Sequence, residues 1–260
     1  QLVPIINIDG PRYPVLGGLW QARGGTARHD AVAWGYARAC SDMGMDIIQK
    51  CEVTGVRQTG GKVTGVSTTR GDIECDKLGM VVAGHSGQLA NMAGFRLPME
   101  SVALQALVSE PIKPCMDVVV MANTVHGYMS QSDKGEMVIG GGTDGHNNYT
   151  QRGSFHHIEE TVRALVETFP MISRLKMLRQ WGGIVDVTGD RSPILSKTPV
   201  EGVFINGGWG TGGFKAIPGS GWGFAELMAK GHSPLTDAFG LERFVEGRFI
   251  DESVAAGVAH

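Results

Sequence analysis

The stretch at residues 207–215, Gly-Gly-Trp-Gly-Thr-Gly-Gly-Phe-Lys, constrains the fold of this chain more than any other. It follows an apolar run at 203–206 that favours a strand, and it precedes a segment that favours a helix. A glycine-rich turn between a strand and a helix exposes backbone N–H groups that can contact a planar ring or an anionic oxygen. We therefore expect a ligand site here, with a purely structural glycine loop as the alternative.

Glycine is abundant along the whole chain, at 39 of 260 residues, about twice its usual share of roughly 7%. The glycines lie in short clusters between apolar runs, which is typical of a protein that wraps around a large ligand. The net charge is −3 and there is no basic run, which argues against a nucleic-acid partner. No apolar stretch approaches the roughly 18 residues that a membrane span needs.

The sequence begins Gln-Leu-Val-Pro, without an initiating Met and without the pattern of a signal peptide. We therefore expect a fragment or a processed chain, located in the cytoplasm. The cysteines form no CxxC pair and lie at no zinc-finger spacing, so we expect buried, reduced thiols. They are Cys40, Cys51, Cys75 and Cys115.

Hydrophobic periodicity predicts helices at about 29–43, 154–169 and 218–229, and a shorter one from about residue 88. Pro170 ends the second of these helices. Pro218 is favoured in the first turn of the third.

Short apolar runs separated by turn residues predict strands. The repeated Val-Thr-Gly-Val at 53–56 and 63–66 flanks a Gly-Gly pair and indicates a β-hairpin. The run at 78–83 indicates a buried strand that leads into a glycine turn at 84–87. Further strands, several of them spaced like an antiparallel sheet, are expected at 46–50, 102–108, 118–121, 128–130, 137–140, 178–187 and 203–206.

The stretch at 207–215 resembles the C-terminal flavin-binding loop of the D-amino-acid oxidase and sarcosine oxidase superfamily, in which a glycine-rich turn ending in Gly-Phe-Lys lies beside FAD. Segments at 52–56, 81–86 and 189–195 resemble other parts of that family, and the likeness covers nearly the whole chain. It implies non-covalent FAD, and it implies that Lys215 is a catalytic residue near the flavin. The cofactor-binding residues that it implies are Val53, Gly84, Gly210, Gly213 and Lys215.

The resemblance implies a mixed α/β flavoprotein with two interleaved lobes. An incomplete FAD-binding lobe is expected from residues 1–95, with an FMN-attachment segment, and from the C-terminal segment 181–260. An antiparallel-sheet substrate lobe is expected from residues 96–180.

A second segment, Gly-Gly-Thr-Ala-Arg-His-Asp at 24–30, lies at the head of the first predicted helix. A helix N-terminus disfavours the imidazolium form, so His29 tends to stay neutral and nucleophilic. By spacing alone, an ordinary polar residue of the cap region is the more common interpretation. The segment resembles the place where β subunits of the heterotetrameric branch of the family attach FMN, which implies covalent FMN on His29 with Arg28 beside it.

The reaction that the resemblance implies is oxidative demethylation of sarcosine to glycine and a one-carbon unit, as formaldehyde or methylene-tetrahydrofolate, with oxygen reduced to hydrogen peroxide. The chain then serves as a β subunit beside α, γ and δ partners. Another secondary amine, such as dimethylglycine, an opine or proline, is an alternative substrate. A catalytically inert fragment is the alternative of a different class.

One part of the family pattern has no counterpart. The strand–turn–helix with Gly-x-Gly-x-x-Gly that holds the FAD pyrophosphate is missing, as is the acidic residue about 20 positions after it. We therefore expect the chain alone to carry part of the FAD site and to be inactive without that segment.

Three other features have weaker meaning. The run His-His-Ile-Glu-Glu at 156–160 lacks the spacing of known metal motifs, so we expect a charged first helical turn and no metal site. The run Gly-Gly-Gly-Thr-Asp-Gly at 140–145 lacks the Gly-Lys-Ser/Thr of a P-loop and indicates a turn after a strand; the family resemblance adds that it borders the substrate cavity. Trp181 and Trp209 are either core residues or cavity wall.

Overall fold

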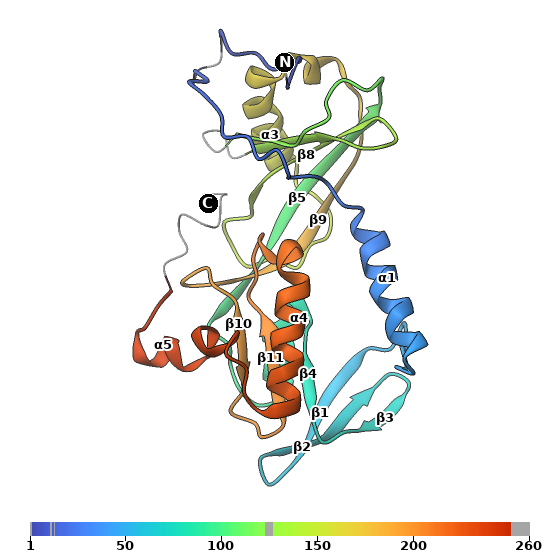
Figure 1. The fold of residues 1–260 in the computed structure, drawn as a ribbon, viewed down its shortest axis with the longest axis vertical. Coiled ribbons are helices and arrows are strands. Elements are labelled where there is room, and N and C mark those ends of the chain that lie inside the picture. Colours follow the sequence, from blue (N-terminus) through green and yellow to red (C-terminus); the bar gives the residue numbers. More distant parts are fainter. Residues whose placement is uncertain (1, 11, 13, 123–126, 251–260) are drawn as a thin grey trace.

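The structure is a computed structural model that describes residues 2–10, 12, 14–122 and 127–250. Its helices and strands form three β-sheets with helices packed around them (Figure 1). The helical elements are α1 (His29–Asp42), η1 (Ala83–His85), α2 (Ser86–Met92), α3 (Phe155–Thr168), η3 (Pro170–Arg174), α4 (Gly213–Lys230), η4 (Asp237–Phe239) and α5 (Glu242–Glu246).

The central three-stranded sheet has the order β10-β11-β4. Strand β11 (Val203–Gly207) pairs antiparallel with β10 (Ile194–Lys197) and parallel with β4 (Leu78–Met80). Every residue of β11 is buried, and Phe224 of α4 packs against Phe204 on one face of the sheet. This packing fixes the end of β11 next to the start of α4.

A second three-stranded sheet contains the hairpin that the repeated Val-Thr-Gly-Val predicts. Strands β1 (Val53–Thr59) and β2 (Lys62–Thr68) pair antiparallel, and β3 (Gly71–Glu74) pairs with β2. Gly60 and Gly61 have φ values of +61° and +81°, the left-handed conformation that a tight two-residue hairpin turn requires.

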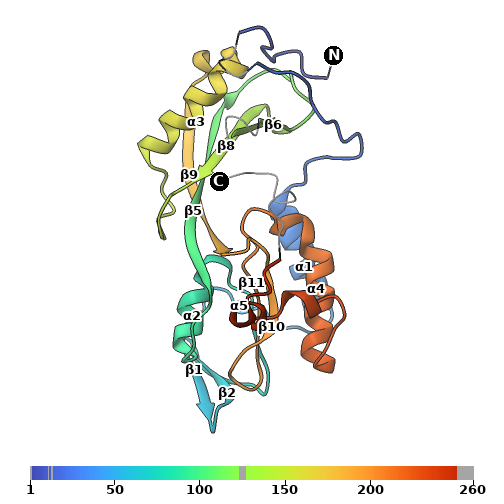
Figure 2. The same cartoon turned by 90° about the vertical axis from the view of Figure 1, so that its left-hand side faces the viewer.

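The third sheet is antiparallel throughout, with the order β6-β7-β8-β5-β9. Helix α3 packs on one of its faces, and Leu165 and Phe169 enter a buried cluster with residues of the sheet (Figure 2). The strands are β5 (Met99–Pro111), β6 (Val120–Ala122), β7 (Gly127–Gln131), β8 (Glu136–Thr143) and β9 (Met177–Thr188).

Strands β5 and β9 are the longest in the described chain and run from the third sheet to the central one (Figure 1). Their pairing extends from Met99 opposite Thr188 to Ser109 opposite Met177, with one shift of register between Val108 and Ser109. Both strands therefore connect the third sheet with the central sheet and mark no boundary between separate domains. The division of the chain into segments 1–95, 96–180 and 181–260 stays a prediction.

The predicted helices at 29–43 and 154–169 are present as α1 and α3. Ser154 caps α3, since its hydroxyl accepts a hydrogen bond from the backbone N–H of His157. Helix α1 forms although none of its residues is buried.

Three predictions of secondary structure were wrong. Residues 46–50 form no strand, and Ile47 and Ile48 stay about half exposed because no described strand pairs with them. Helix α4 begins at Gly213 and not at Pro218, which lies inside the helix and removes one backbone donor. The strand expected at 78–83 ends at Met80, where the chain turns into η1.

No helix of the described residues has the length and hydrophobicity of a membrane span. The four cysteines are free, as expected, but each is half-buried and not fully buried.

Candidate functional site

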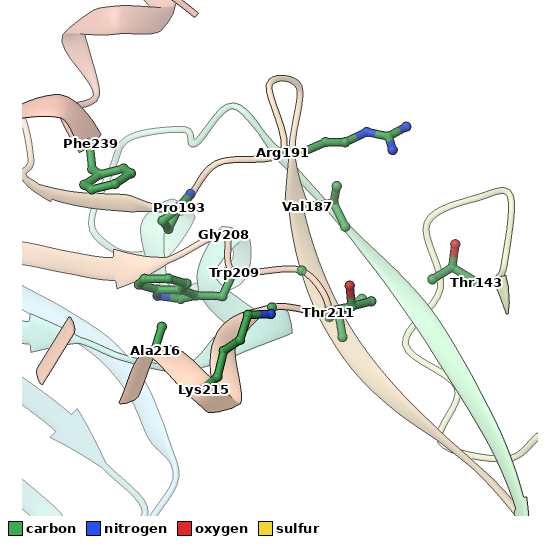
Figure 3. Close-up of a pocket in the computed structure, with 13 residues that line it drawn as sticks. Thr143, Val187, Arg191, Pro193, Gly208, Trp209, Thr211, Lys215, Ala216 and Phe239 are labelled. Carbon is green, nitrogen blue, oxygen red and sulfur yellow. The ribbon is translucent and has the colours of Figure 1, made fainter. Parts of the chain in front are cut away.

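A cavity of about 190 Å³ lies where β9, the end of β11 and the first turn of α4 meet (Figure 3). Its described lining contains two cationic side chains and no acidic one. The lining residues are Thr143, Val185, Val187, Arg191, Pro193, Gly208, Trp209, Gly210, Thr211, Gly212, Lys215, Ala216 and Phe239. The volume suits a small ligand or one end of a larger one.

The wall between β11 and α4 is the glycine loop, residues 207–213. Gly208 and Gly210 have φ values of +75° and +51°, which L side chains rarely adopt. A Cβ added to Gly208 would also lie 2.8 Å from Cγ2 of Thr188. The loop therefore needs glycine for its backbone shape and for its close approach to β9.

Asp186 of β9 holds the glycine loop in place. Its Oδ2 accepts hydrogen bonds from the backbone N–H of Gly208 at 2.7 Å and from the hydroxyl of Ser86 at 3.3 Å. Its backbone carbonyl accepts from the N–H of Gly210 at 2.8 Å. The side chain is buried, so these contacts satisfy a carboxylate that would otherwise be costly to bury.

The N-terminus of α4 opens into the cavity. Gly212 is the N-cap and supplies no side-chain acceptor, while Gly212, Lys215 and Ala216 all line the cavity. The first backbone N–H groups of a helix lack partners within the helix and carry partial positive charge. Together with the exposed Lys215, they give this side of the cavity a positive potential.

Three of the predicted residues come together at this loop. Gly210 and Lys215 line the cavity, and Gly213 packs against the side chain of Trp209. Trp209 forms cavity wall, and its indole Nε1 donates a hydrogen bond to Oδ1 of Asn206 at 2.6 Å. The glycine-rich stretch therefore indicated the right place for a cavity.

Gly84 and Val53 lie away from the cavity, in packed surroundings. A Cβ added to Gly84 would lie 2.2 Å from Cγ2 of Ile184, so this glycine allows η1 to pack against β9. The backbone carbonyl of Gly84 accepts a hydrogen bond from the Ser101 hydroxyl at 2.6 Å. Val53 is half-buried against the core of the central sheet. Contact of either residue with FAD stays a prediction.

His29 and Arg28 lie at the start of α1 and do not line the cavity. Both are exposed. The guanidinium of Arg28 pairs with Asp30 at 3.4 Å and with Asp133 at 3.8 Å. These two carboxylates offset part of the charge of Arg28. The covalent FMN stays a prediction.

The turn after β9 carries a cationic residue that sequence reasoning missed. Arg191 lines the cavity, and the buried neighbour Asp190 forms a two-pronged ion pair with Arg243 at 2.7 and 3.0 Å. Burial raises the pKa of the Asp190 carboxyl, but hydrogen bonds from Arg243 and from the N–H groups of Ile250 and Ser192 outweigh it and bring that pKa down to about 2. The turn is therefore anchored by a permanent charge pair.

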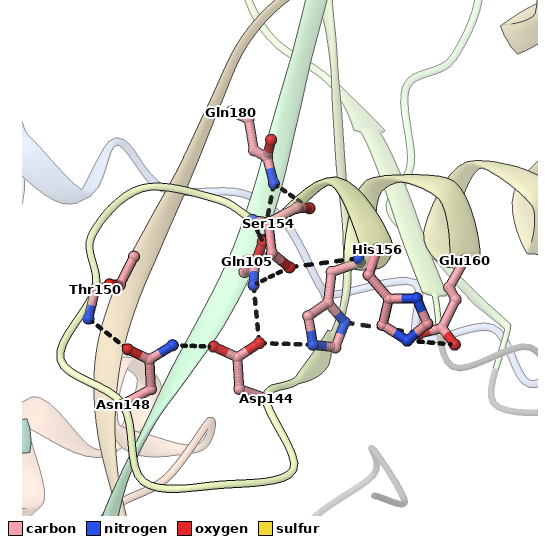
Figure 4. A network of polar contacts seen from close by, with 9 residues as sticks. Gln105, Asp144, Asn148, Thr150, Ser154, His156, Glu160 and Gln180 are labelled. Atoms are coloured by element: carbon pink, nitrogen blue, oxygen red, sulfur yellow. Dashed lines mark hydrogen bonds and ion pairs between the residues drawn. The ribbon is translucent and has the colours of Figure 1, made fainter.

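A buried polar network lies at the end of β8, next to Thr143 of the cavity wall (Figure 4). Asp144 accepts from the amide of Gln105 at 3.0 Å, and its Oδ1 lies 2.7 Å from Nε2 of His157. His157, in the charged first turn of α3 that was expected, is therefore partly buried and pairs with Asp144 just after β8. The described residues contain no group of three metal-ligating side chains.

The residues of the cavity fit one edge of a flavin. The glycine loop allows close approach of a planar ring, and the uncapped N-terminus of α4 suits a ring edge that gains negative charge on reduction. A complete FAD is larger than this cavity, so its remaining parts need other surfaces.

The spacing Gly-x-Gly-x-x-Gly occurs in the glycine loop itself, at Gly208, Gly210 and Gly213. A dinucleotide-binding turn lies inside a βαβ unit, whose second strand runs parallel to the first. After α4 the described chain contains only η4 and α5, and no strand. The spacing therefore does not replace the pyrophosphate-binding segment.

Comparison with known proteins first gives the class. The family described as FAD dependent oxidoreductase, abbreviated DAO, matches residues 2–227. The chain belongs to this family.

The curated relatives show which members of the family the chain is similar to. The chain is 79% identical over all 260 residues to sarcosine oxidase subunit beta of Rhodobacter capsulatus, and it covers 63% of that protein. It is 54% identical to sarcosine oxidase subunit beta of an Arthrobacter species, covering 65% of it. The chain therefore spans a little under two thirds of the length of these relatives.

Solved structures share the fold. L-proline dehydrogenase from P. horikoshii matches with a TM-score of 0.77 and 24% identity, over 83% of this chain and 59% of that one. Glycine oxidase from Geobacillus kaustophilus matches with a TM-score of 0.72 and 20% identity, over 82% of this chain and 57% of that one. The predicted mixed α/β, D-amino-acid oxidase-like fold class is confirmed.

Proposed function

We propose that this chain is the part of a sarcosine oxidase β subunit that contacts both the flavin edge and the substrate. The observation that carries the proposal is the cavity, where the glycine loop and Lys215 meet and no described lining residue is acidic. The sequence identity of the chain to proteins named sarcosine oxidase subunit beta supports the choice of sarcosine as the substrate.

Sarcosine is a small secondary amine with one carboxylate. Lys215 would bind that carboxylate by a charge-assisted contact and so orient the N-methyl group. Val185, Val187 and Trp209 would exclude water beside the reacting carbon. Bound FAD supplies the redox chemistry, as acceptor of a hydride equivalent from the methyl group. The products proposed are glycine, a one-carbon unit as formaldehyde or methylene-tetrahydrofolate, and hydrogen peroxide.

The second flavin is proposed on His29. The residue is exposed at a helix N-terminus, away from the cavity, so a covalent FMN there would not compete with FAD. We further propose assembly with α, γ and δ subunits in the cytoplasm, and weak FAD binding and no activity for residues 1–260 alone.

Anaerobic reduction of the flavin in the protein made from its complete reading frame tests the proposal. Sarcosine should bleach the flavin absorbance at least tenfold faster than L-proline or dimethylglycine at equal concentration, because the small cavity suits the smallest substrate. Fast bleaching by proline with none by sarcosine would assign the site to another secondary amine. A folded protein that takes up no flavin would favour the inert alternative.

A further inference from the structure

Asp186 is a buried acidic residue beside the cavity, and it is only 3% exposed. Among the described residues its carboxylate takes part in no ion pair, in contrast to the buried Asp190, which pairs with Arg243. A buried charge without an opposite charge is costly to a fold. Its position next to a ligand cavity therefore points to a role in the site.

Two donors among the described residues reach the carboxylate of Asp186. The backbone N–H of Gly208 donates to Oδ2 at 2.7 Å, and the hydroxyl of Ser86 lies 3.3 Å from the same atom. That hydroxyl has a single proton, and the carbonyl oxygen of Ala83 lies closer to it, at 2.6 Å. Asp186 thus receives one short hydrogen bond and a share of a second, and these neutral donors leave its net charge in place.

The carboxylate of Asp186 lies directly behind the wall of the cavity. Its neighbours on β9, Val185 and Val187, line the cavity, and so does Gly208, to which it is bonded. A Cβ added to Gly207 would lie only 3.0 Å from Oδ2, so glycine at this position keeps the loop in contact with the carboxylate. One layer of backbone and aliphatic side chains separates the charge from the cavity, and such surroundings screen it far less than water does.

The charge of Asp186 acts on a ring bound in the cavity when that ring is reduced. Under the proposed function the methyl group of the substrate loses a hydride, which carries two electrons and one proton to the ring. The amine becomes an iminium cation, and the ring gains one negative charge. Lys215, Arg191 and the N-terminus of α4 favour that negative charge, whereas Asp186 has the same sign and opposes it.

We propose that Asp186 is a positioning residue that holds the glycine loop through its hydrogen bond and, through its charge, lowers the reduction potential of the flavin bound there. This inference rests on the proposed function. A lower potential makes the reduced flavin a stronger electron donor toward the next acceptor. The cations of the cavity therefore promote uptake of the hydride, and Asp186 promotes the onward transfer of its electrons.

The experiment measures the reduction potential of the FAD-loaded protein from its complete reading frame, in a His29→Asn background so that FAD is the only flavin. Equilibration with a redox dye of known potential gives the value without substrate. Asp186→Asn keeps a carbonyl oxygen for the N–H of Gly208 and removes the charge. It should raise the equilibrium constant for two-electron reduction about tenfold, which corresponds to about 30 mV, and leave the melting temperature nearly unchanged.

Two further variants separate the charge of Asp186 from its hydrogen bond. Asp72→Asn is the matched control, because it removes the same charge from an exposed ion pair with Arg57 in the second sheet and should leave the potential unchanged. Asp186→Ala removes both the charge and the acceptor. It should shift the potential in the same direction as Asp186→Asn and, in addition, lower the melting temperature; an unaltered melting temperature would contradict the role of the hydrogen bond.

Ser86→Ala gives a test of opposite sign that does not depend on the folding of an Asp186 variant. The hydroxyl dipole offsets part of the negative charge, so its loss should lower the equilibrium constant for reduction roughly threefold. An unchanged potential in Asp186→Asn, or in Ser86→Ala if Asp186→Asn does not fold, would overturn the role of the charge, while reduction by sarcosine would still support the proposed function. Wild-type protein that takes up no FAD would contradict both.

Discussion

Lys215 enters the cavity from the first turn of α4, where the helix N-terminus adds to its charge. Lys215→Met keeps the length of the side chain and removes the ammonium. We expect kcat/KM for sarcosine to fall roughly 100-fold, about 2.7 kcal/mol of transition-state binding, because the carboxylate loses its fixed partner. Steady-state kinetics measures this, with Lys230→Met, an exposed residue at the other end of α4, as control. Unaltered kinetics would remove Lys215 from the site.

His29 is the second residue with a testable role. We expect FMN to stay with the acid-precipitated wild-type protein and to be lost from the His29→Asn variant. The proposed covalent bond to FMN needs an imidazole nitrogen, which the variant lacks. Mass spectrometry of the tryptic peptide that contains His29 provides the measurement. A wild-type peptide without the mass of FMN would leave FAD as the single flavin.

Asp190 makes stability depend on pH at the acid end. Its pKa falls from 3.8 to about 2 on folding, so the folded state binds the proton less tightly than the unfolded state. The difference contributes about 2 kcal/mol of stability, which is fully present above pH 4 and is lost as the pH falls through 2. Arg243→Met, which leaves a buried carboxylate unpaired, should cost about 3–5 kcal/mol near pH 7.

Denaturant unfolding at several pH values measures this effect. The gap between wild type and Arg243→Met should narrow as the pH drops, because protonation removes the charge that the variant leaves unpaired. Arg248→Met, at an exposed ion pair with Glu246, should show no such gap. A gap for Arg243→Met that is independent of pH would contradict the assignment.

Among single residues, the sequence predicted those site residues that lie close together in one short motif. Gly210, Gly213 and Lys215 lie within one short stretch, so their meeting at one turn was predictable. Asp186 holds the glycine loop from β9, and Arg191 lines the same cavity from the turn after β9. No periodicity or spacing signals such long-range contacts; they depend on how β9 packs against the loop.

At the scale of elements, Gly84 allows η1 to touch β9. Gly84→Ala should lower the free energy of unfolding by about 1–3 kcal/mol, because the new methyl group would overlap the side chain of Ile184. Gly87→Ala is the matched control, since an added Cβ there meets nothing within 4 Å and lies inside α2. Thermal or urea unfolding measures both. The Ile184→Ala background should reduce the cost of Gly84→Ala, and an equal cost in both backgrounds would contradict the overlap.

The elements that sequence predicted well are those with local signals. The hairpin of β1 and β2 has its Gly-Gly turn, and α3 has a capping serine and an apolar face. Residues 46–50 form an apolar run that is typical of a strand. A strand also needs a partner strand, and the local sequence does not predict whether one lies beside it. Strands β3 and β10 have four residues each, too few to give a clear alternation. The early start of α4 escaped prediction because glycines disfavour helix.

At the scale of the whole molecule, we propose that the chain contains one end of a flavin site. We expect the dissociation constant of FAD from residues 1–260 alone to exceed about 1 μM. The described residues offer no helix N-terminus within a βαβ unit for the pyrophosphate. Fluorescence titration measures this, with the protein from the complete reading frame as comparison. Submicromolar binding by residues 1–260 would show that the glycine loop and its surroundings suffice.

The regular pairing of β5 with β9 from Met99 to Val108 limits how this architecture can vary over evolution. Side chains alternate between the two faces of a strand, and Val185 and Val187 face the cavity while Asp186 between them holds the glycine loop. One residue gained or lost within β9 before Asp186 would exchange these roles, turning the carboxylate into the cavity and the valines away from it. Insertions and deletions should therefore accumulate in the loops that connect the strands of the third sheet, while β5 and β9 keep a constant number of residues.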